Sequence, residues 1–426
     1  MHNSSNSSAA NGDALGGAAS PRLLLASLLA VALVACDGDN SSNGSGQGDG
    51  ALSFGLAAAD LNGDTLIDLV SATVDNQDSA SAAAARVILR DVKAGDGFAT
   101  AMDYGMGAQA QHIAVGDLNG DGRADLLVSN YADSALSLRL QSSAVPGRFL
   151  SRTVIDQVSR PREAAIADFN GDNLNDIAVI GSSIALLFND ATEPGNFALG
   201  RLLSLAQPGR TIASADLDRD GRMDLVVGGG GSVITVYLQD RLPAAAGTFS
   251  SSLELEVGDQ PYDIALGDLN YDRLQDIVVV NWGRAGDVTA ATVSVLFQRS
   301  YPSDRVEFNA ARHYPIAGKG TSVVIADLDG DDLPDIAATN ELAIGGGISV
   351  LYQRGGTLIG FDPEFEPAVL LPARLPYGLG AADFNGDRWT DLAITNPDGT
   401  LVLYQQPGVP RRFGWPQLVG AQPAAM

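Results

Sequence analysis

Short apolar runs separated by polar turns recur along the chain from about residue 51 to residue 420. One run precedes an Asp-rich turn, as in HIAVG (112–116), and a second follows it, as in DLLVSN (125–130). A third run alternates, as in VSVLFQ (293–298). Runs this short, rich in β-branched residues and bounded by Gly, Pro, Asn or Asp, predict β-strands, and no amphipathic helical period competes with them after residue 50.

A fourth run follows in each unit and is predicted to begin near a phenylalanine. The phenylalanines concerned are Phe98, Phe149, Phe197, Phe249, Phe308, Phe361 and Phe413.

The Asp-rich turn between the first and second runs is a nonapeptide that occurs seven times. We number the copies loops 1 to 7: DLNGDTLID (60–68), DLNGDGRAD (117–125), DFNGDNLND (168–176), DLDRDGRMD (216–224), DLNYDRLQD (268–276), DLDGDDLPD (327–335) and DFNGDRWTD (383–391). Every copy has Asp at positions 1, 5 and 9, Asn or Asp at position 3, and Leu or Phe at position 2. A solvated acidic turn has no reason to keep this pattern, so it favours a loop built around a cation.

The loops start 48 to 59 residues apart, a period typical of propellers and solenoids. Four antiparallel strands in each of seven repeats predict an all-β, seven-bladed β-propeller over residues 51–420, in which radial packing buries both faces of every sheet. A solenoid would need distinct capping units, whereas all the repeats here look alike. The sequence leaves open whether the ring closes by sharing one blade between both chain ends.

Calcium is the cation that fits these loops, because Ca²⁺ takes six to eight oxygen ligands in flexible geometry, whereas Mg²⁺ demands a stricter octahedron. The early spacing is that of an EF-hand loop, but the last carboxylate comes at position 9 and the flanks are not helical. The cofactor prediction is therefore up to seven Ca²⁺ ions, one per blade, acting as structural ions.

The expected ligands are the side chains at positions 1, 3, 5 and 9 and the backbone carbonyl at position 7. By loop they are Asp60, Asn62, Asp64, Leu66, Asp68; Asp117, Asn119, Asp121, Arg123, Asp125; Asp168, Asn170, Asp172, Leu174, Asp176; Asp216, Asp218, Asp220, Arg222, Asp224; Asp268, Asn270, Asp272, Leu274, Asp276; Asp327, Asp329, Asp331, Leu333, Asp335; and Asp383, Asn385, Asp387, Trp389, Asp391.

The sites are expected to be unequal. Position 4 or 6 usually needs a permissive backbone, which glycine supplies in six loops. Loop 5 has Tyr271 and Arg273 there, so it is predicted to be the weakest site. Loops 4 and 6 have four acidic ligands each and are predicted to be among the tightest.

Composition agrees with cation binding and narrows the function. The chain has 51 acidic and 26 basic residues, a formal net charge of −25, which disfavours nucleic acid as a partner. It has only three histidines and one cysteine, so zinc chemistry or His-based catalysis has little to work with.

The pattern I-A-x-x-D-[LF]-[ND]-x-D-x-x-x-D-[LI], followed by V-x-V-L-x-[QN], resembles the FG-GAP/VCBS repeat that also forms the integrin alpha-subunit propeller. The resemblance covers about residues 51–420 and is specific, because seven copies agree. It implies a calcium-bearing propeller whose ligands are those of each nonapeptide. It does not imply an integrin function or name a partner.

The N-terminal segment reads as a signal peptide (1–35). Its apolar run LLLASLLAVALVA (23–35) is too short to span a bilayer comfortably. Leu33 to Cys36 resembles a bacterial lipobox, which implies lipidation of Cys36 and a lipid-anchored protein of the cell envelope. Asp37 then weakly favours retention at the inner membrane, and residues 36–50 are a Gly/Ser-rich tether. The alternatives are an ordinary secretion signal with an incidental cysteine and a wrongly chosen start codon.

Residues that flank the strands opposite the loops diverge between repeats, which makes that rim a candidate ligand face. The densest cluster is Tyr262, Asp263, Asn281, Trp282 and Arg284. The alternative is that the asparagines end strands and the aromatic residues cover blade edges.

Three function classes remain: a non-catalytic binding or adhesion module for a protein or glycan, which we favour; a polysaccharide lyase or glycosidase; and a purely structural assembly lipoprotein. Glu163, Asp263 or Glu341 could supply carboxylates to an enzyme. The sequence contains no nucleophile elbow, HExxH motif or P-loop and no persuasive acid–base pair, so the prediction is that the protein is not an enzyme.

Overall fold

The computed structural model describes residues 52–74, 82–94, 97–205, 207–241, 247–284, 287, 290–299, 305–341, 346–354 and 361–420. Within these ranges the regular elements are 28 β-strands in seven four-stranded sheets. The predicted signal peptide, Cys36 and the tether to residue 50 lie outside the described residues.

Each sheet is one blade, made of four strands that follow one another in the chain. Blades 1 to 7 are β1 (Leu52–Ala59), β2 (Asp68–Val74), β3 (Ala82–Ile88), β4 (Met102–Ala108); β5 (Ala110–Gly116), β6 (Asp125–Asn130), β7 (Ala135–Arg139), β8 (Thr153–Ile155); β9 (Glu163–Ala167), β10 (Asp176–Ile180), β11 (Ile184–Asn189), β12 (Phe197–Leu203); β13 (Gly209–Ala215), β14 (Asp224–Gly229), β15 (Val233–Leu238), β16 (Ser251–Glu256); β17 (Pro261–Gly267), β18 (Asp276–Asn281), β19 (Thr292–Leu296), β20 (Arg312–Pro315); β21 (Lys319–Ala326), β22 (Asp335–Glu341), β23 (Gly347–Leu351), β24 (Val369–Pro372); and β25 (Leu379–Ala382), β26 (Asp391–Asn396), β27 (Gly399–Leu403), β28 (Gln417–Leu418).

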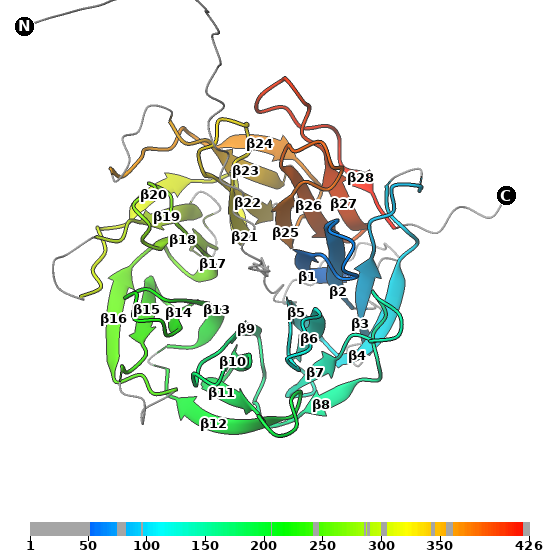
Figure 1. The fold of residues 1–426 in the computed structure, drawn as a ribbon. Coiled ribbons are helices and arrows are strands. Elements are labelled where there is room, and N and C mark those ends of the chain that lie inside the picture. Colours follow the sequence, from blue (N-terminus) through cyan, green and yellow to red (C-terminus); the bar gives the residue numbers. More distant parts are fainter. Residues whose placement is uncertain are drawn as a thin grey trace, which may run out of the picture. The chain divides into compact units, whose positions relative to one another are not determined.

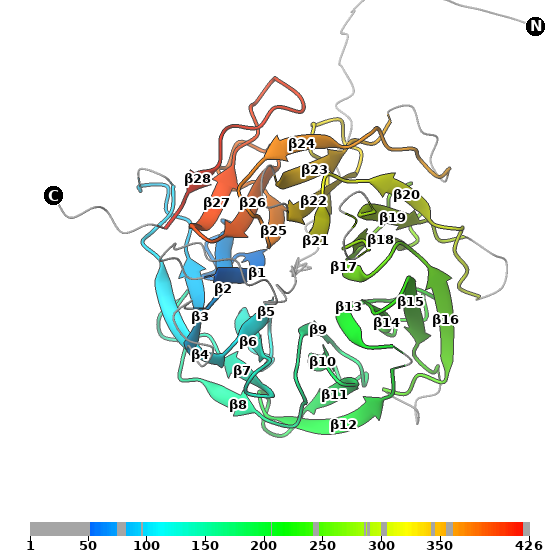
Figure 2. The same ribbon diagram turned by 180° about the vertical axis from the view of Figure 1, so that it is seen from behind.

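The blades surround a central axis, with the first strand of each blade innermost and the fourth on the periphery (Figure 1). The view from behind shows the same ring of sheets (Figure 2). Neighbouring strands within a blade pair antiparallel, as in β5 with β6 and β6 with β7. The prediction of an all-β, seven-bladed propeller with four-stranded antiparallel blades is confirmed.

The ring closes without a shared blade. The first blade is built wholly from residues 52–108 and the last from residues 379–418, so no strand crosses between them. Hydrogen bonds join the two instead: the backbone N–H of Ala101 donates to the carbonyl of Gly420 (3.1 Å), and Arg90 donates to the carbonyl of Asn385 (3.3 Å).

The core lies between blades, because both faces of each sheet are covered by its neighbours. All six residues of β6 are buried. Leu127 packs toward blade 3 beside Ile177, and Val128 packs toward blade 1 beside Val70. Adjacent residues of one strand therefore serve opposite interfaces, and each fully buried side chain contributes about 1.5–3 kcal/mol of transfer free energy.

The apolar residue at position 2 of each nonapeptide anchors its loop in this core. In every copy it is at most 1% exposed: Leu61, Leu118, Phe169, Leu217, Leu269, Leu328 and Phe384.

A glutamine or asparagine after the third strand links neighbouring blades. The Gln141 side-chain amide donates to the carbonyl of Leu61 in blade 1 (2.7 Å), and Gln405 donates in the same way to Leu328 in blade 6 (2.8 Å). The equivalent residue of blade 6, Gln353, is 1% exposed, and neither side-chain polar atom has a hydrogen-bond partner among the described residues.

In most blades the fourth strand begins a few residues after the phenylalanine near which it was predicted to begin. Phe98, Phe149, Phe308 and Phe413 make isolated bridges to the residue two positions after the third strand, and the fourth strand begins four residues after each. In blade 6 this position belongs to Phe365, and the choice of Phe361 was wrong because that ring is 65% exposed. Only Phe197 itself begins a fourth strand, β12, whereas Phe249 precedes β16 by two residues.

Candidate metal centres

The seven loops connect the first and second strands of their blades, as predicted. β5 ends at Gly116, loop 2 follows, and its ninth residue, Asp125, begins β6. Neighbouring loops touch, which places them on one face of the ring. The Asn175 side chain in loop 3 donates to the carbonyl of Asp117 in loop 2 (2.8 Å), and the Tyr271 hydroxyl in loop 5 donates to the carbonyl of Asp332 in loop 6.

The position-1 aspartate organises the backbone of each loop. In loop 2, one oxygen of Asp117 accepts from the N–H of Gly120 (2.7 Å), and the other accepts from the N–H of Gly122 (2.7 Å). The same carboxylate-to-position-6 bond recurs in all seven loops. The loop is therefore wound around this side chain, and its carboxylate is fixed in place.

Positions 4 and 6 both adopt left-handed backbone in every loop, a stricter requirement than one permissive position. Only loop 2 has glycine at both, Gly120 (φ 72°) and Gly122 (φ 78°). Loop 5 holds Tyr271 at φ 58° and Arg273 at φ 68°, a conformation that costs a non-glycine residue roughly 1–2 kcal/mol. The Tyr271 bond to loop 6 offsets part of that cost.

The position-9 aspartates are buried at the base of the loops. Asp125 accepts from the N–H groups of Leu118 (2.9 Å) and Gln141 (2.7 Å). Burial is the main cause that raises the pKa of its carboxyl to about 7; nearby Asp121 and Asp117 contribute to the rise, and the two N–H donors oppose it. The pKa is likewise raised to about 7 for Asp68, Asp224, Asp276, Asp335 and Asp391, and to about 6 for Asp176. A divalent cation would favour the charged form of such a group.

Position 3 divides the loops into two kinds. In four of the five Asn loops the side-chain amide donates to the position-5 carboxylate, as Asn119 does to Asp121 (2.9 Å). In loop 4, Asp218 instead accepts from Arg241 (3.0 Å), and in loop 6, Asp329 accepts from Arg411 (2.8 Å). Neither arginine is predictable from the sequence, because Arg411 lies 82 residues from its partner and no motif marks either one.

The donors in these loops fit calcium. Loops 4 and 6 each bring three carboxylates, from positions 1, 3 and 9, so close that one oxygen of each lies within 4.8 Å of the others: Asp216, Asp218 and Asp224, and Asp327, Asp329 and Asp335. These two groups do not include the position-5 carboxylates Asp220 and Asp331. The set contains only oxygen donors, which are the ligands that hard cations such as Ca²⁺ take. The role of the position-7 carbonyls stays a prediction.

The candidate ligand face lies at the other ends of the inner strands, and most of it is interior. Tyr262 is 2%, Asp263 1% and Asn281 0% exposed, so these side chains were wrongly placed on a surface. Asp263 accepts from the backbone N–H groups of Ile264 (2.7 Å) and Val323 (2.9 Å). Arg284 is exposed and pairs with Asp259 (3.3 Å).

Trp282 belongs to a stacked column that crosses three blades. Its ring stacks on Tyr262 with a centroid separation of 4.9 Å and an interplanar angle of 14°. The Arg210 guanidinium lies 4.2 Å from the centroid of Tyr262, and the Lys319 ammonium lies 4.4 Å from that of Trp282. We call these four residues the cation–aromatic column. Lys319 was missed, since a lysine that begins a strand carries no sequence signal of its own.

The carboxylates proposed for an enzyme do not meet in an open site. Glu163 and Asp263 are both at most 2% exposed, and they belong to the inner strands of blades 3 and 5. Burial raises the pKa of Asp263 to about 7, but its oxygens are engaged by backbone N–H groups. Glu341, at the end of β22, is half-buried.

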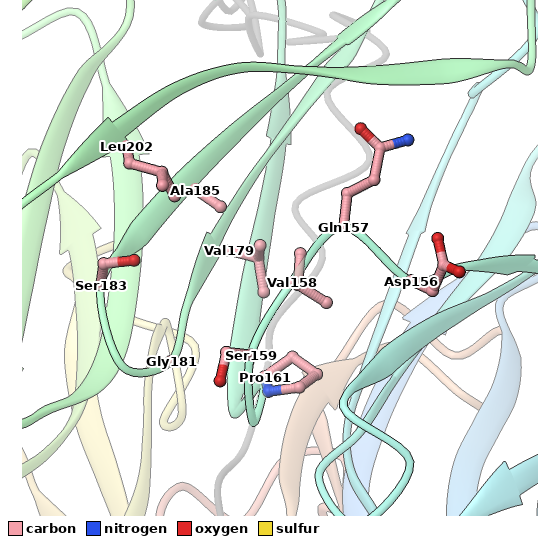
Figure 3. A pocket seen from close by; sticks show the side chains of 10 residues that line it. All are labelled: Asp156, Gln157, Val158, Ser159, Pro161, Val179, Gly181, Ser183, Ala185 and Leu202. Atoms are coloured by element: carbon pink, nitrogen blue, oxygen red, sulfur yellow. The ribbon is translucent and has the colours of Figure 1, made fainter.

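A cavity of about 360 Å³ lies beside blade 3, under the connection from β8 to β9 (Figure 3). Its wall is mostly apolar, with Val158, Val179 and Leu202, and Ser159 and Ser183 add hydroxyls. Asp156 is the one carboxylate in the lining, so the cavity holds no acid–base pair.

Comparisons with known proteins agree with the repeat and the fold. A family model described as the FG-GAP-like repeat matches residues 60–128, 117–179, 168–227 and 216–279, and the FG-GAP repeat model matches residues 375–408. The chain is 25% identical to integrin alpha pat-2 of Caenorhabditis elegans over 247 residues, which cover 45% of this chain and 20% of that protein. It is 22% identical over 267 residues to human cartilage acidic protein 1, covering 57% and 40%.

The chain thus spans less than half of the length of these curated relatives. Among solved structures, Sqt1 from Chaetomium thermophilum superposes with a TM-score of 0.51 at 12% identity, covering 84% of this chain and 98% of that one, which shows likeness of fold alone. In the part of the chain that the structure describes, no helix is long and apolar enough to cross a membrane.

Proposed function

We propose, from the premise that the chain belongs to the FG-GAP repeat family, that it is a calcium-stabilised propeller acting as a non-catalytic binding or adhesion module of the cell envelope. The FG-GAP propeller supports a module of the binding or adhesion type. The observation that carries the calcium part is the set of seven loops, each wound around one carboxylate, with a second carboxylate buried beneath it.

Calcium in this proposal is structural. Each ion would join the two innermost strands of a blade and offset the repulsion among carboxylates a few ångströms apart. A site filled at a hundred times its Kd stabilises the folded state by about 2.7 kcal/mol, so several filled sites have a large combined effect.

The test compares chelator-treated protein with the same protein in calcium chloride at about a hundredfold molar excess over the protein. Elemental analysis after dialysis gives the ion count, and a thermal scan gives the melting temperature. We expect up to seven ions per chain and a lower melting temperature without calcium. Equal melting temperatures, or no retained calcium, would refute the proposal.

The binding part rests on the rim that carries the cation–aromatic column, where Trp282 is partly exposed. Stacked aromatic rings and cations are frequent anchors in protein recognition, and here they cross blades 4 to 6. Glycan arrays and pull-downs on calcium-loaded protein test this with the variant Trp282→Ala. The control is Trp415→Ala, because the Trp415 side chain is exposed on blade 7 and lies outside the column. Loss of a captured protein or glycan in Trp282→Ala alone is the expected result.

The same assays separate the alternatives. Turnover of a captured polysaccharide that disappears in Glu163→Gln or Asp263→Asn would contradict a non-catalytic module. A fully folded, calcium-loaded protein that captures nothing would favour the assembly role.

The envelope location rests on Cys36, the only cysteine of the chain. A lipid on this residue, followed by the tether, would hold the propeller at a membrane surface. Labelling cells with an alkyne fatty acid should mark the wild-type protein and not Cys36→Ser, and the unlabelled variant should leave the membrane fraction. Equal labelling of both proteins would exclude this anchor.

A further inference from the structure

The position-3 residue has one orientation in both kinds of loop. Its Oδ1 atom accepts from the backbone N–H of position 5 whether the residue is Asn119 (3.2 Å), Asp218 (3.2 Å) or Asp329 (3.2 Å). Asp218 and Asp329 therefore differ from the asparagines at the second terminal atom, where a carboxylate oxygen replaces an amide nitrogen. In four of the five Asn loops that nitrogen donates to the position-5 carboxylate.

Substituting aspartate at this point should be unfavourable, since two carboxylate oxygens would face each other. In loop 4 the Arg241 guanidinium meets both, with Nη2 3.0 Å from Oδ2 of Asp218 and Nε 3.5 Å from Oδ2 of Asp220. Arg241 thus supplies the positive group that the asparagine amide supplies elsewhere.

In loop 6 the arginine comes from the next blade. Arg411, between β27 and β28, donates from Nε to Oδ2 of Asp329 (2.8 Å) and from Nη1 to Glu366 (2.9 Å). Its guanidinium also lies 4.4 Å from the ring centroid of Tyr352. Asp329 is only 5% exposed at its side chain, so this pair is better shielded from solvent than an ordinary surface ion pair.

We propose that Arg241 and Arg411 are built-in counter-ions that offset the fourth carboxylate of loops 4 and 6 and so set the calcium affinity of these two loops. The inference rests on the calcium binding proposed above. The four ligand aspartates of each of these loops and its arginine together carry a formal charge of −3, equal to that of the three ligand aspartates of an Asn loop. The count of acidic ligands therefore overstates how tightly these two sites hold calcium.

The proposal makes the two single substitutions act in opposite directions. Arg411→Gln leaves four carboxylates without their counter-ion and should tighten calcium binding to loop 6 about tenfold, by the Coulomb energy of a unit charge a few ångströms from a divalent ion. Asp329→Asn leaves the arginine beside three carboxylates and should weaken binding by about the same factor. The double variant restores the charge of an Asn loop and should return to within about threefold of wild type.

Trp389 gives a local signal for this measurement. Its ring lies against Gly330 of loop 6, close enough that a methyl group on that glycine would meet it at 2.5 Å. Calcium is titrated into chelator-treated protein while tryptophan fluorescence is followed, with Trp415→Phe in every variant to remove the exposed tryptophan near Arg411. Because Trp389 belongs to loop 7, Asp383→Asn identifies the phase that loop 7 contributes.

Arg411→Lys and Arg374→Gln are the controls. Lysine keeps the charge, so its calcium affinity should stay within about threefold of wild type. Arg374 pairs with Asp398 (2.9 Å), which is not a calcium ligand, so its removal should not shift the loop 6 phase. Thermal scans at saturating calcium confirm that each variant is folded.

Opposite shifts in the single variants and recovery in the double variant support the proposal. It is overturned if Arg411→Gln binds calcium with unchanged or lower affinity, or if Arg411→Lys behaves as Arg411→Gln does. If wild-type protein takes up no calcium at all, the calcium function fails first, and that result is distinct because it appears before any variant is compared.

Discussion

The His112→Phe variant should lose less stability than the wild-type protein as the pH falls from 8 to 5. His112 lies in β5, is 0% exposed, and neither ring nitrogen has a hydrogen-bond partner among the described residues. Burial lowers the pKa of its imidazole to about 3, well below its ordinary value of 6.5. The folded protein therefore keeps this ring neutral, whereas the unfolded chain binds a proton near pH 6.5.

The sign follows from this difference. A depressed folded-state pKa means that the stability owed to the neutral ring is fully present above pH 6.5 and is lost as the pH falls toward 3. Between pH 8 and pH 5 only the unfolded chain takes up the proton, and the loss in the free energy of unfolding is about 2 kcal/mol. Phenylalanine leaves no unpaired nitrogen, so its effect at pH 8 should be small.

The assay is urea denaturation at saturating calcium at both pH values, with the free energy of unfolding of each variant compared with wild type at the same pH. His112→Leu repeats the test with a smaller side chain, in case the phenyl ring does not fit. His313→Asn removes an exposed histidine instead. The reasoning is refuted if wild type and both His112 variants lose equal stability between the two pH values.

Gln405→Leu should lower the free energy of unfolding by about 1–3 kcal/mol, because it leaves the buried carbonyl of Leu328 unpaired. Gln353→Leu should be neutral or stabilising, because neither polar atom of that side chain has a hydrogen-bond partner among the described residues. Urea denaturation of the two variants checks this. Arg273→Gly should raise stability by about 1 kcal/mol in the same assay, since it relieves a left-handed backbone at φ 68°. Burial raises the pKa of Asp263 to about 7, so the stability that wild type owes to the protonated carboxyl declines as the pH rises from about 4 through 7. The free energy of unfolding of Asp263→Asn should therefore gain on the order of 2 kcal/mol relative to wild type between pH 5 and pH 8. The same difference between the two proteins at both pH values would contradict this prediction.

The sequence predicts the repeat unit well, because each part of it answers a local requirement. The position-2 residue must be apolar to enter the core, and the position-1 aspartate must bind the N–H groups of its own loop, so both recur in every copy. The fourth strand was harder to locate, because a phenylalanine in an isolated bridge and a phenylalanine in a loop look alike in sequence. In the structure Phe365 pairs with Gln353 and is buried, whereas Phe361 is exposed.

Contacts between blades are the part that the sequence does not show. Arg411 acts on a loop far away in the chain, and Lys319 reaches Trp282 only because blade 6 follows blade 5 around the ring. The error over Tyr262 and Asn281 has the same origin, since strand ends that look exposed in one repeat are covered by the next repeat.

The repeats differ in the residues that flank their inner strands, and at one position of the repeat this difference has a structural cause. Five residues before each loop, the inner strand carries a buried residue, and two of these positions face the backbone of the next blade. Asp263 accepts from the N–H of Val323 there, and a side chain on Gly55 would lie 3.0 Å from the N of Ile113. The group at this point of the junction thus differs between blades: it is a hydrogen-bonding carboxylate at Asp263 and no side chain at all at Gly55. Variation at this position therefore reflects the spacing between two blades. Residues that contact a ligand are to be sought one position earlier in the strand, where Arg210 and Tyr262 belong to the cation–aromatic column. The seven buried residues are Gly55, His112, Glu163, Thr211, Asp263, Ser322 and Gly378.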